Sequence, residues 1–377
     1  MAVGEWGNDG PSGAQSCVYY VDDIETLVDA TSGDRASITE LYLAQAVDGK
    51  TPSGSKPALI EKLLLKSGDT MTVKTHPWND GSVNFSLLTI ENITIGDGTG
   101  NAKFNVNENQ GVLINNVNGS ITGEINGTLT FEGTEENELN IAYSGVDAFT
   151  GSGVLVIGDH ATVTVDRGDG GNSAAAIQSN IKILGGGTMN VTKMDAMGWG
   201  ADGTYAALIT LEGNESKDAT LTIAGDQTMG SEFNLNGHAI INGTGAITPV
   251  KKNGIIISAS GTSNTIAAGL LTRDSITLNV AEESELTVSG LVSLSTNIGH
   301  KGNDNYETSS IIKKGAGTVY FTNDKNVFGN KYYNVYSTAW CSGTYKGLYL
   351  HQGIDQESGK GAGASRTDNK RAVSGSC

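Results

Sequence analysis

The fold is decided by a stretch that reads Ser275-Ile276-Thr277-Leu278-Asn279-Val280-Ala281-Glu282-Glu283-Ser284-Glu285-Leu286-Thr287-Val288. Apolar residues alternate with polar ones on both sides of the acidic turn. Because successive side chains of a β-strand point to opposite faces, a period of two places one face in a core and the other in water. The stretch therefore predicts two short, half-buried strands joined by a tight turn.

The same alternation recurs over residues 69–330, in segments that end at Gly, Asp or Asn, such as Ala161-Thr162-Val163-Thr164-Val165 and Ala219-Thr220-Leu221-Thr222-Ile223. The inward positions are mostly Ile, Val and Leu, which suit coils stacked on one another, and no linker or shift in composition interrupts the series. We predict an all-β fold, a right-handed parallel β-helix, with coils of ~20–25 residues. A β-sandwich is the alternative, since it also combines short strands with frequent turns.

Composition and charge limit the function. The chain has 377 residues with 52 Gly, 5 Pro and 17% charged residues, and its formal net charge is −17. Such a surface repels phosphates and anionic lipids, so nucleic acid is an unsuitable partner. We find no run of ~20 apolar residues, the length that a membrane-spanning helix needs.

The two ends differ from the middle. Residues 1–68 show helical spacing at 22–28, 37–47 and 56–66, which predicts a helical cap over the open end of the β-helix. Residues 331–377 combine an aromatic stretch with a Gly/Ser/Lys tail, and we expect a closing cap followed by disorder. The first residues lack the features of a signal peptide, so an exported protein would be present as its mature chain. The pairing of three cysteines stays open: Cys17, Cys341 and Cys377.

One segment carries a family resemblance. It reads Ile311-Ile312-Lys313-Lys314-Gly315-Ala316-Gly317-Thr318-Val319-Tyr320-Phe321-Thr322 and is followed by Asn326, Phe328 and Gly329. It resembles the passenger-associated β-strand repeat of bacterial autotransporters, and residues 276–293 resemble the coils that precede that repeat. The glycines would turn the chain, while Val319 and Phe321 would point inward. The resemblance implies an extracellular β-helix with a role in adhesion, aggregation or biofilms. The membrane barrel that ends autotransporters has no counterpart after Phe328.

Candidate chemistry is sparse. The best cluster combines Asp159-His160 with Asp166, Arg167 and Asp169, which would supply the acids and the base that a polysaccharide lyase or glycoside hydrolase needs. Solvent-exposed turns explain the same residues. The tripeptide 167–169 also spells an integrin motif, which a Gly-rich chain produces by chance. We expect no catalytic residue, metal or cofactor; the turn at 96–101 is similar to Ca²⁺-binding turns of β-rolls, but it lacks their tandem repeats.

Two classes of function follow. The first is a secreted bacterial cell-surface protein, adhesin-like or self-associating, whose side face or loops bind a host glycan, a protein or another copy of the chain. The second is a glycan-active β-helix enzyme. A trimeric phage tailspike is a third reading.

Overall fold

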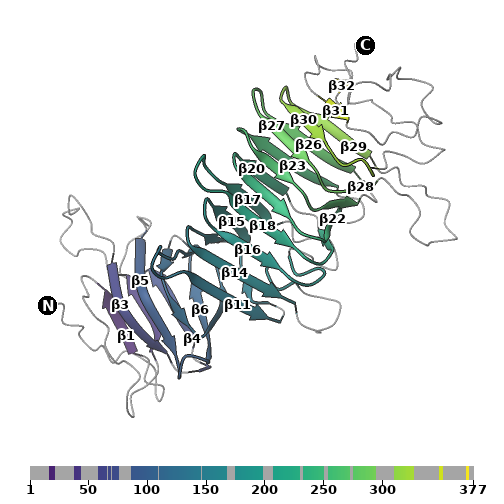
Figure 1. The fold of residues 1–377 in the computed structure, drawn as a ribbon. Coiled ribbons are helices and arrows are strands. Elements are labelled where there is room, and N and C mark those ends of the chain that lie inside the picture. Colours follow the sequence, from purple (N-terminus) through teal and green to yellow (C-terminus); the bar gives the residue numbers. More distant parts are fainter. Residues whose placement is uncertain are drawn as a thin grey trace. The chain divides into compact units, whose positions relative to one another are not determined.

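A computed structural model describes residues 17–21, 38–43, 58–65, 67–68, 70–75, 86–108, 110–145, 147–167, 175–197, 207–229, 232–249, 254–271, 275–293, 310–326, 348–350 and 371–372. Regular structure in these residues consists of β-strands (Figure 1). The chain divides into two compact units. Unit 1 comprises Met1–Thr164 and Ile177–Ile181, and unit 2 comprises Val165–Ala176 and Lys182–Cys377.

Unit 1 is a coil with two main sheets. Sheet 1 has the strand order β1 (Cys17–Val21), β2 (Ile38–Leu43), β4 (Thr70–Thr75), β6 (Asn101–Val106), β9 (Ser120–Glu124) and β12 (Phe149–Thr150). Sheet 2 has the order β3 (Ala58–Leu65), β5 (Ser86–Ile95), β7 (Gln110–Ile114), β10 (Thr128–Phe131) and β13 (Val154–Ile157), with β8 (Val117–Asn118) paired to β5. From β3 onward the chain alternates between the two sheets, apart from β8 and β11, and the pairings within both sheets are parallel.

Three further strands lie around the boundary between the units. They are β11 (Leu139–Ser144), β14 (Ala161–Asp166) and β15 (Asn180–Leu184). Within unit 1, β11 is the sheet neighbour of β14, and the amide of Leu139 donates to the carbonyl oxygen of His160 over 2.9 Å.

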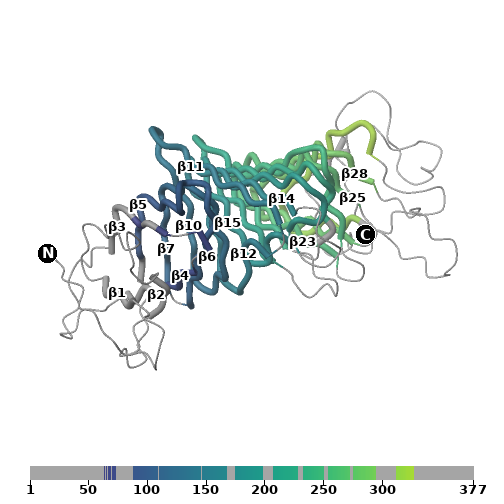
Figure 2. Tube along the Cα trace, turned by 90° about the horizontal axis from the view of Figure 1, so that it is seen from below, coloured from purple at the N-terminus to yellow at the C-terminus, as the bar shows by residue number. Residues whose placement is uncertain are grey.

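Unit 2 has three parallel sheets, and its coils are visible as repeated turns of the tube in Figure 2. Sheet 3 contains β17 (Leu208–Glu212), β20 (Glu232–Asn236), β23 (Ile255–Ser260), β26 (Ser275–Val280) and β29 (Ser310–Lys314). Sheet 4 contains β16 (Thr188–Val191), β18 (Ala219–Ile223), β21 (Ala239–Asn242), β24 (Asn264–Ile266), β27 (Glu285–Val288) and β30 (Thr318–Phe321). Sheet 5 contains β19 (Gln227–Met229), β22 (Ala246–Pro249), β25 (Gly269–Leu271) and β28 (Val292–Ser293).

The end of sheet 4 is extended by two short strands. β31 (Leu348–Leu350) pairs parallel with β30, and β32 (Arg371–Ala372) pairs antiparallel with β31. The rest of the predicted aromatic cap and tail over residues 331–377 lies outside the described residues, as do Cys341 and Cys377.

The register of unit 2 gives the length of one coil. Leu208 pairs with Glu232 and Glu232 with Ile256, so two coils of sheet 3 advance by 24 residues each. Ile256 then pairs with Thr277, which is 21 residues further on. These three steps match the predicted coil length, whereas the steps from Thr188 to Thr220 and from Ser275 to Ser310 are longer, at 32 and 35 residues. The parallel pairing confirms the solenoid and is incompatible with the β-sandwich alternative.

Alternating side chains fill the interior. In sheet 4, one inward ladder runs through Met189, Leu221, Ile241, Ile266, Val288 and Phe321, none of them more than 2% exposed. Burying each such side chain contributes about 1.5–3 kcal/mol relative to exposure. In unit 1, the rings of Phe131 and Phe149 meet edge to face with centroids 6.1 Å apart. The cores are therefore built from stacked copies of one position in successive coils.

Glycine allows neighbouring coils to approach at the corners. His160 and His238 adopt the left-handed conformation, with φ of 53° and 46°, just before β14 and β21. A Cβ atom on Gly133 or Gly213 would lie 2.3 Å from the carbonyl oxygen of His160 or His238, respectively. Only glycine fits beneath these corners without a shift of the backbone.

The predicted helices are wrong wherever the structure describes them. The segments at 37–47 and 56–66 contain β2 and β3 instead. Leu63 and Leu65 are 0% and 2% exposed, and β3 pairs in parallel with β5. Apolar residues spaced for a helix face also include alternating positions, and the hydrogen bonds available from the neighbouring coil favour the strand. The predicted helix at 22–28 lies outside the described residues.

Candidate functional site

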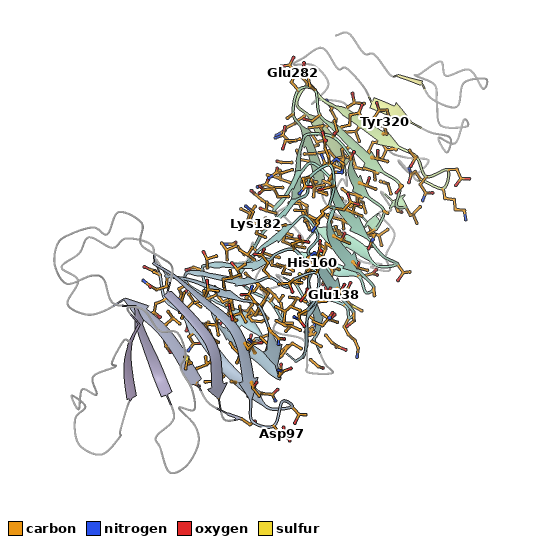
Figure 3. All side chains as sticks on the ribbon, turned by 60° about the vertical axis from the view of Figure 1, so that its left-hand side comes forward. Asp97, Glu138, His160, Lys182, Glu282 and Tyr320 are labelled. Atoms are coloured by element: carbon orange, nitrogen blue, oxygen red, sulfur yellow. The ribbon has the colours of Figure 1, made fainter. Side chains whose placement is uncertain are left out.

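The first candidate pair, Asp159 and His160, forms a corner of unit 1. One carboxylate oxygen of Asp159 accepts a hydrogen bond from the His160 amide over 3.0 Å and lies 3.6 Å from His160 Nε2. The corner contacts the preceding coil, because the amide of Gly133 donates to the carbonyl oxygen of Asp159. Figure 3 labels Glu138 close to His160, in the segment just before β11. These contacts give the pair a structural task at the corner.

The second group is only partly described. Asp166 is the last residue of β14, and its Oδ1 atom lies 3.9 Å from Lys193 Nζ. Both residues belong to unit 2. Asp166 and Arg167 are half-buried, whereas Asp169 lies outside the described residues. An acid beside a lysine can hold a charged ligand or pass a proton. Among the described residues, no three His, Cys, Asp or Glu side chains gather as metal ligands would.

The turn at residues 96–101 holds its own aspartate. Asp97 Oδ1 accepts hydrogen bonds from the Thr99 hydroxyl over 2.6 Å and from the Thr99 amide over 3.1 Å. These hydrogen bonds hold the pKa of Asp97 below its usual value, the hydroxyl contributing most. Figure 3 places Asp97 at the outer end of the turn. The contacts describe a self-contained turn, and the Ca²⁺ suggestion stays a prediction.

The autotransporter-like segment folds as β29 and β30 around a glycine turn. Val319 and Phe321 point inward as predicted, with exposures of 0% and 2%. A Cβ atom on Gly315, where φ is 76°, would lie 2.1 Å from the carbonyl oxygen of Val280, so this turn requires glycine. The sequence therefore anticipated both the inward positions and the turn.

Lys313 occupies an inward position. It continues a ladder that runs through Ile209, Phe233, Ile257 and Leu278, and it is only 5% exposed. Its ammonium group donates a hydrogen bond to the carbonyl oxygen of Gly315. Burial lowers the pKa of Lys313. The lysine of the motif thus packs its stem in the core and ties the strand to the turn that follows.

A further surface was not singled out from the sequence. Sheet 4 presents two outward rows, which together we call the Thr/Asn face: Thr188, Thr220, Ile240, Thr265, Thr287 and Tyr320 in the first row, and Asn190, Thr222 and Asn242 in the second. Each of these side chains is half-buried against its neighbours in the row. The sequence did show that a polar residue separates the inward apolar residues of each strand. It did not show which of these polar residues align in one row, because that depends on the register between strands.

The outward side of sheet 3 includes a row of a different kind. Leu208, Glu232 and Ile256 lie in one exposed row. Nearby, Lys182 Nζ lies 2.8 Å from Glu212 Oε2 in an ion pair. Charged and large apolar groups are therefore mixed in this part of sheet 3, whereas a second outward row, formed by Thr210, Asn234, Ser258 and Asn279, is uncharged like the Thr/Asn face.

The fold and these surfaces define a parallel β-solenoid whose described interior is packed with side chains. Comparison of the chain with protein-family models, with curated proteins and with solved structures finds no match. The resemblance to autotransporter passengers therefore stays a prediction from sequence. Within the described part of the chain, no helix is long and apolar enough to cross a membrane.

Proposed function

We propose that this chain is a secreted bacterial cell-surface protein that works as a stiff, non-catalytic spacer and binds through its outer faces, as an adhesin or as a self-associating component. One observation carries the proposal: the coil interiors are filled by side chains such as Leu221 and Phe233, which are 0% exposed. Partners must then meet an outer face, a corner or an end of the solenoid. A net charge of −17 suits a soluble extracellular surface.

Two finer points belong to the same proposal. The segment at 311–326 supports a relationship to autotransporter passengers, because Gly315, Lys313 and the inward residues Val319 and Phe321 fit the motif; Phe328 and Gly329 lie outside the described residues. The winding is right-handed, since about 98% of connections between parallel strands of one sheet have that hand.

The proposal is tested by locating and imaging the protein. Antibodies against the purified chain should label intact cells of the source bacterium without permeabilisation, and a cytoplasmic protein serves as the negative control. Electron microscopy of the purified chain distinguishes the two modes, with single particles for an adhesin and filaments for a self-associating component. Labelling that requires permeabilisation would refute the surface role.

A further inference from the structure

The Thr/Asn face is distinguished first by its lack of charge. Six strands of sheet 4 contribute to it, and none of its nine positions carries Asp, Glu, Lys, Arg or His. Ionisable side chains adjoin it: Glu285 accepts a hydrogen bond from the Tyr320 hydroxyl, and the pair Asp218 and His238 lies two residues before Thr220 and Ile240. Aspartate and glutamate outnumber lysine and arginine in the chain, 41 to 24. A neutral strip on such an acidic protein is suited to a neutral partner, because no charge has to be stripped of water when the partner binds.

At β18, β21, β24 and β27 the face is also bordered by short turns on both sides. The corners that lead into sheet 4 are formed by residues 213–218, 237–238, 261–263, 281–284 and 315–317, and those that lead out by 224–226, 243–245, 267–268 and 289–291. Between Leu208 and Phe321, every residue outside the described ranges falls instead between a strand of sheet 5 and the next strand of sheet 3.

The spacing of the face is regular. Residues in one row repeat at the distance between strands, about 4.8 Å, and the two rows lie about 6.6 Å apart along each strand. From Thr188 on β16 to Tyr320 on β30, the first row spans five strand spacings, roughly 24 Å. Threonine is stiff about χ1, so its hydroxyl and methyl groups are held in place before a partner binds.

The chemistry of the rows matches a sugar polymer. Threonine hydroxyls and asparagine amides can donate and accept hydrogen bonds, while the threonine methyls and the Ile240 side chain offer apolar contact to the C–H faces of a sugar ring. Tyr320, labelled in Figure 3, closes the first row with an aromatic ring, and its hydroxyl donates to Glu285 Oε1 over 3.1 Å. A hexose unit of an extended chain is about as long as one strand spacing.

We propose that the Thr/Asn face binds an uncharged, extended polysaccharide that runs across the strands of sheet 4. Anionic glycans are disfavoured because a net charge of −17 repels them. This inference gives a ligand class to the proposed surface protein, and it rests on the proposed function only in assuming that the protein encounters the glycan outside the cell. If the glycan fails to bind while intact cells are still labelled, this inference falls and the proposed function stands.

The test measures retention of the full chain on a panel of polysaccharides: cellulose, chitin, xylan, mannan, curdlan and starch, with polygalacturonate and hyaluronate as anionic members. The altered face carries Thr220→Asp and Thr265→Asp, and the matched control carries Thr210→Asp and Thr277→Asp on the outward side of sheet 3. A second variant, Thr220→Val with Thr265→Val, keeps the shape and strand propensity but removes the hydroxyls. Circular dichroism checks that all variants fold.

The expected result is binding to at least one neutral polysaccharide, weakened at least tenfold by the Asp pair on sheet 4, several-fold by the Val pair and less than twofold by the control pair. Three binding results would overturn the inference: no retention on any neutral member, preference for the anionic members, or binding that survives the Asp pair on sheet 4. A Thr/Asn face that instead joins two copies would show as an oligomer in sedimentation that the same Asp pair dissociates, and that result also overturns it.

Discussion

Gln227 offers the sharpest test of the described geometry, because hydrophobic pattern and hydrogen bonding predict opposite results for its replacement. It occupies an inward ladder of sheet 5 in which the next coils place Ile247, Leu270 and Val292. Its side chain is 0% exposed. By pattern alone, Gln227→Leu completes an apolar stack and should stabilise the protein.

The contacts predict the opposite. Gln227 Oε1 accepts hydrogen bonds from the amides of Ala196 and Met197 over 2.8 and 3.2 Å. Its Nε2 donates to the carbonyl oxygens of Lys193 and Gly225 over 2.7 and 2.8 Å. Leucine leaves two buried amides without an acceptor, at about 1–3 kcal/mol each, or about 4 kcal/mol in total. Burial of the leucine side chain returns about 2 kcal/mol. The net destabilisation is about 2 kcal/mol.

Amide hydrogen exchange measures this locally, which suits a solenoid whose coils open separately. In Gln227→Leu the amides of Ala196 and Met197 should lose protection by roughly 30-fold, which corresponds to about 2 kcal/mol. The amide of Val292, which lies two coils beyond Ile247 and donates to Asn326 Oδ1 over 2.8 Å, is the internal control and should change little. Unchanged or increased protection at both Ala196 and Met197 would refute the reasoning.

Three further predictions concern packing, charge and chemistry. Gly123→Ala should lower the melting temperature by several degrees, because its Cβ atom would lie 2.0 Å from the carbonyl oxygen of Phe104. Gly158→Ala should lower the melting temperature less, because the nearest neighbour of its Cβ atom is the Glu132 Cβ atom at 3.1 Å. The reverse order in thermal unfolding would contradict the described approach of the coils. Lys313→Met should be more stable than the wild type in denaturant unfolding near pH 7, and this difference in unfolding free energy should shrink towards pH 10. A lysine with a lowered pKa binds fewer protons in the folded state than in the unfolded state, so the wild type gains stability as the pH rises. A difference that grows with pH would show that burial does not destabilise the charged form of Lys313. Polygalacturonate incubated with the chain should give no unsaturated product, and a product that appears with the wild type and disappears with Asp166→Asn would replace the spacer proposal with the enzyme.

The sequence predicted the solenoid because alternation is a local property. Residues 219–223 and 285–288 alternate in the sequence and in their burial, so the inward face could be assigned without coordinates. The segment at 58–65 failed for the same reason, since its leucines satisfy the spacing of a helix and of a strand equally well. Pairing with β5, which comes later in the chain, selects the strand, and local spacing carries no information about it.

The candidate surfaces depended on long-range register. Thr188 and Thr220 are neighbours in one row although 32 residues separate them, and the sequence did not show which threonines align. The task of Gln227 was equally hidden, because its partners lie 2–34 residues earlier in the chain. By contrast, the turn at Gly315 followed from the sequence, since a glycine next to an alternating segment is a local signal.

Spin-label distances in unit 2 test the parallel stacking most directly. Cysteines introduced at position 188 and, in turn, at 265, 287 and 320, in a background without Cys17, Cys341 and Cys377, report distances across the strands of sheet 4. Parallel coils predict backbone separations that increase by about 4.8 Å per strand, from roughly 14 Å at 265 to roughly 24 Å at 320. Distances that do not increase in this order would contradict the stacking of successive coils.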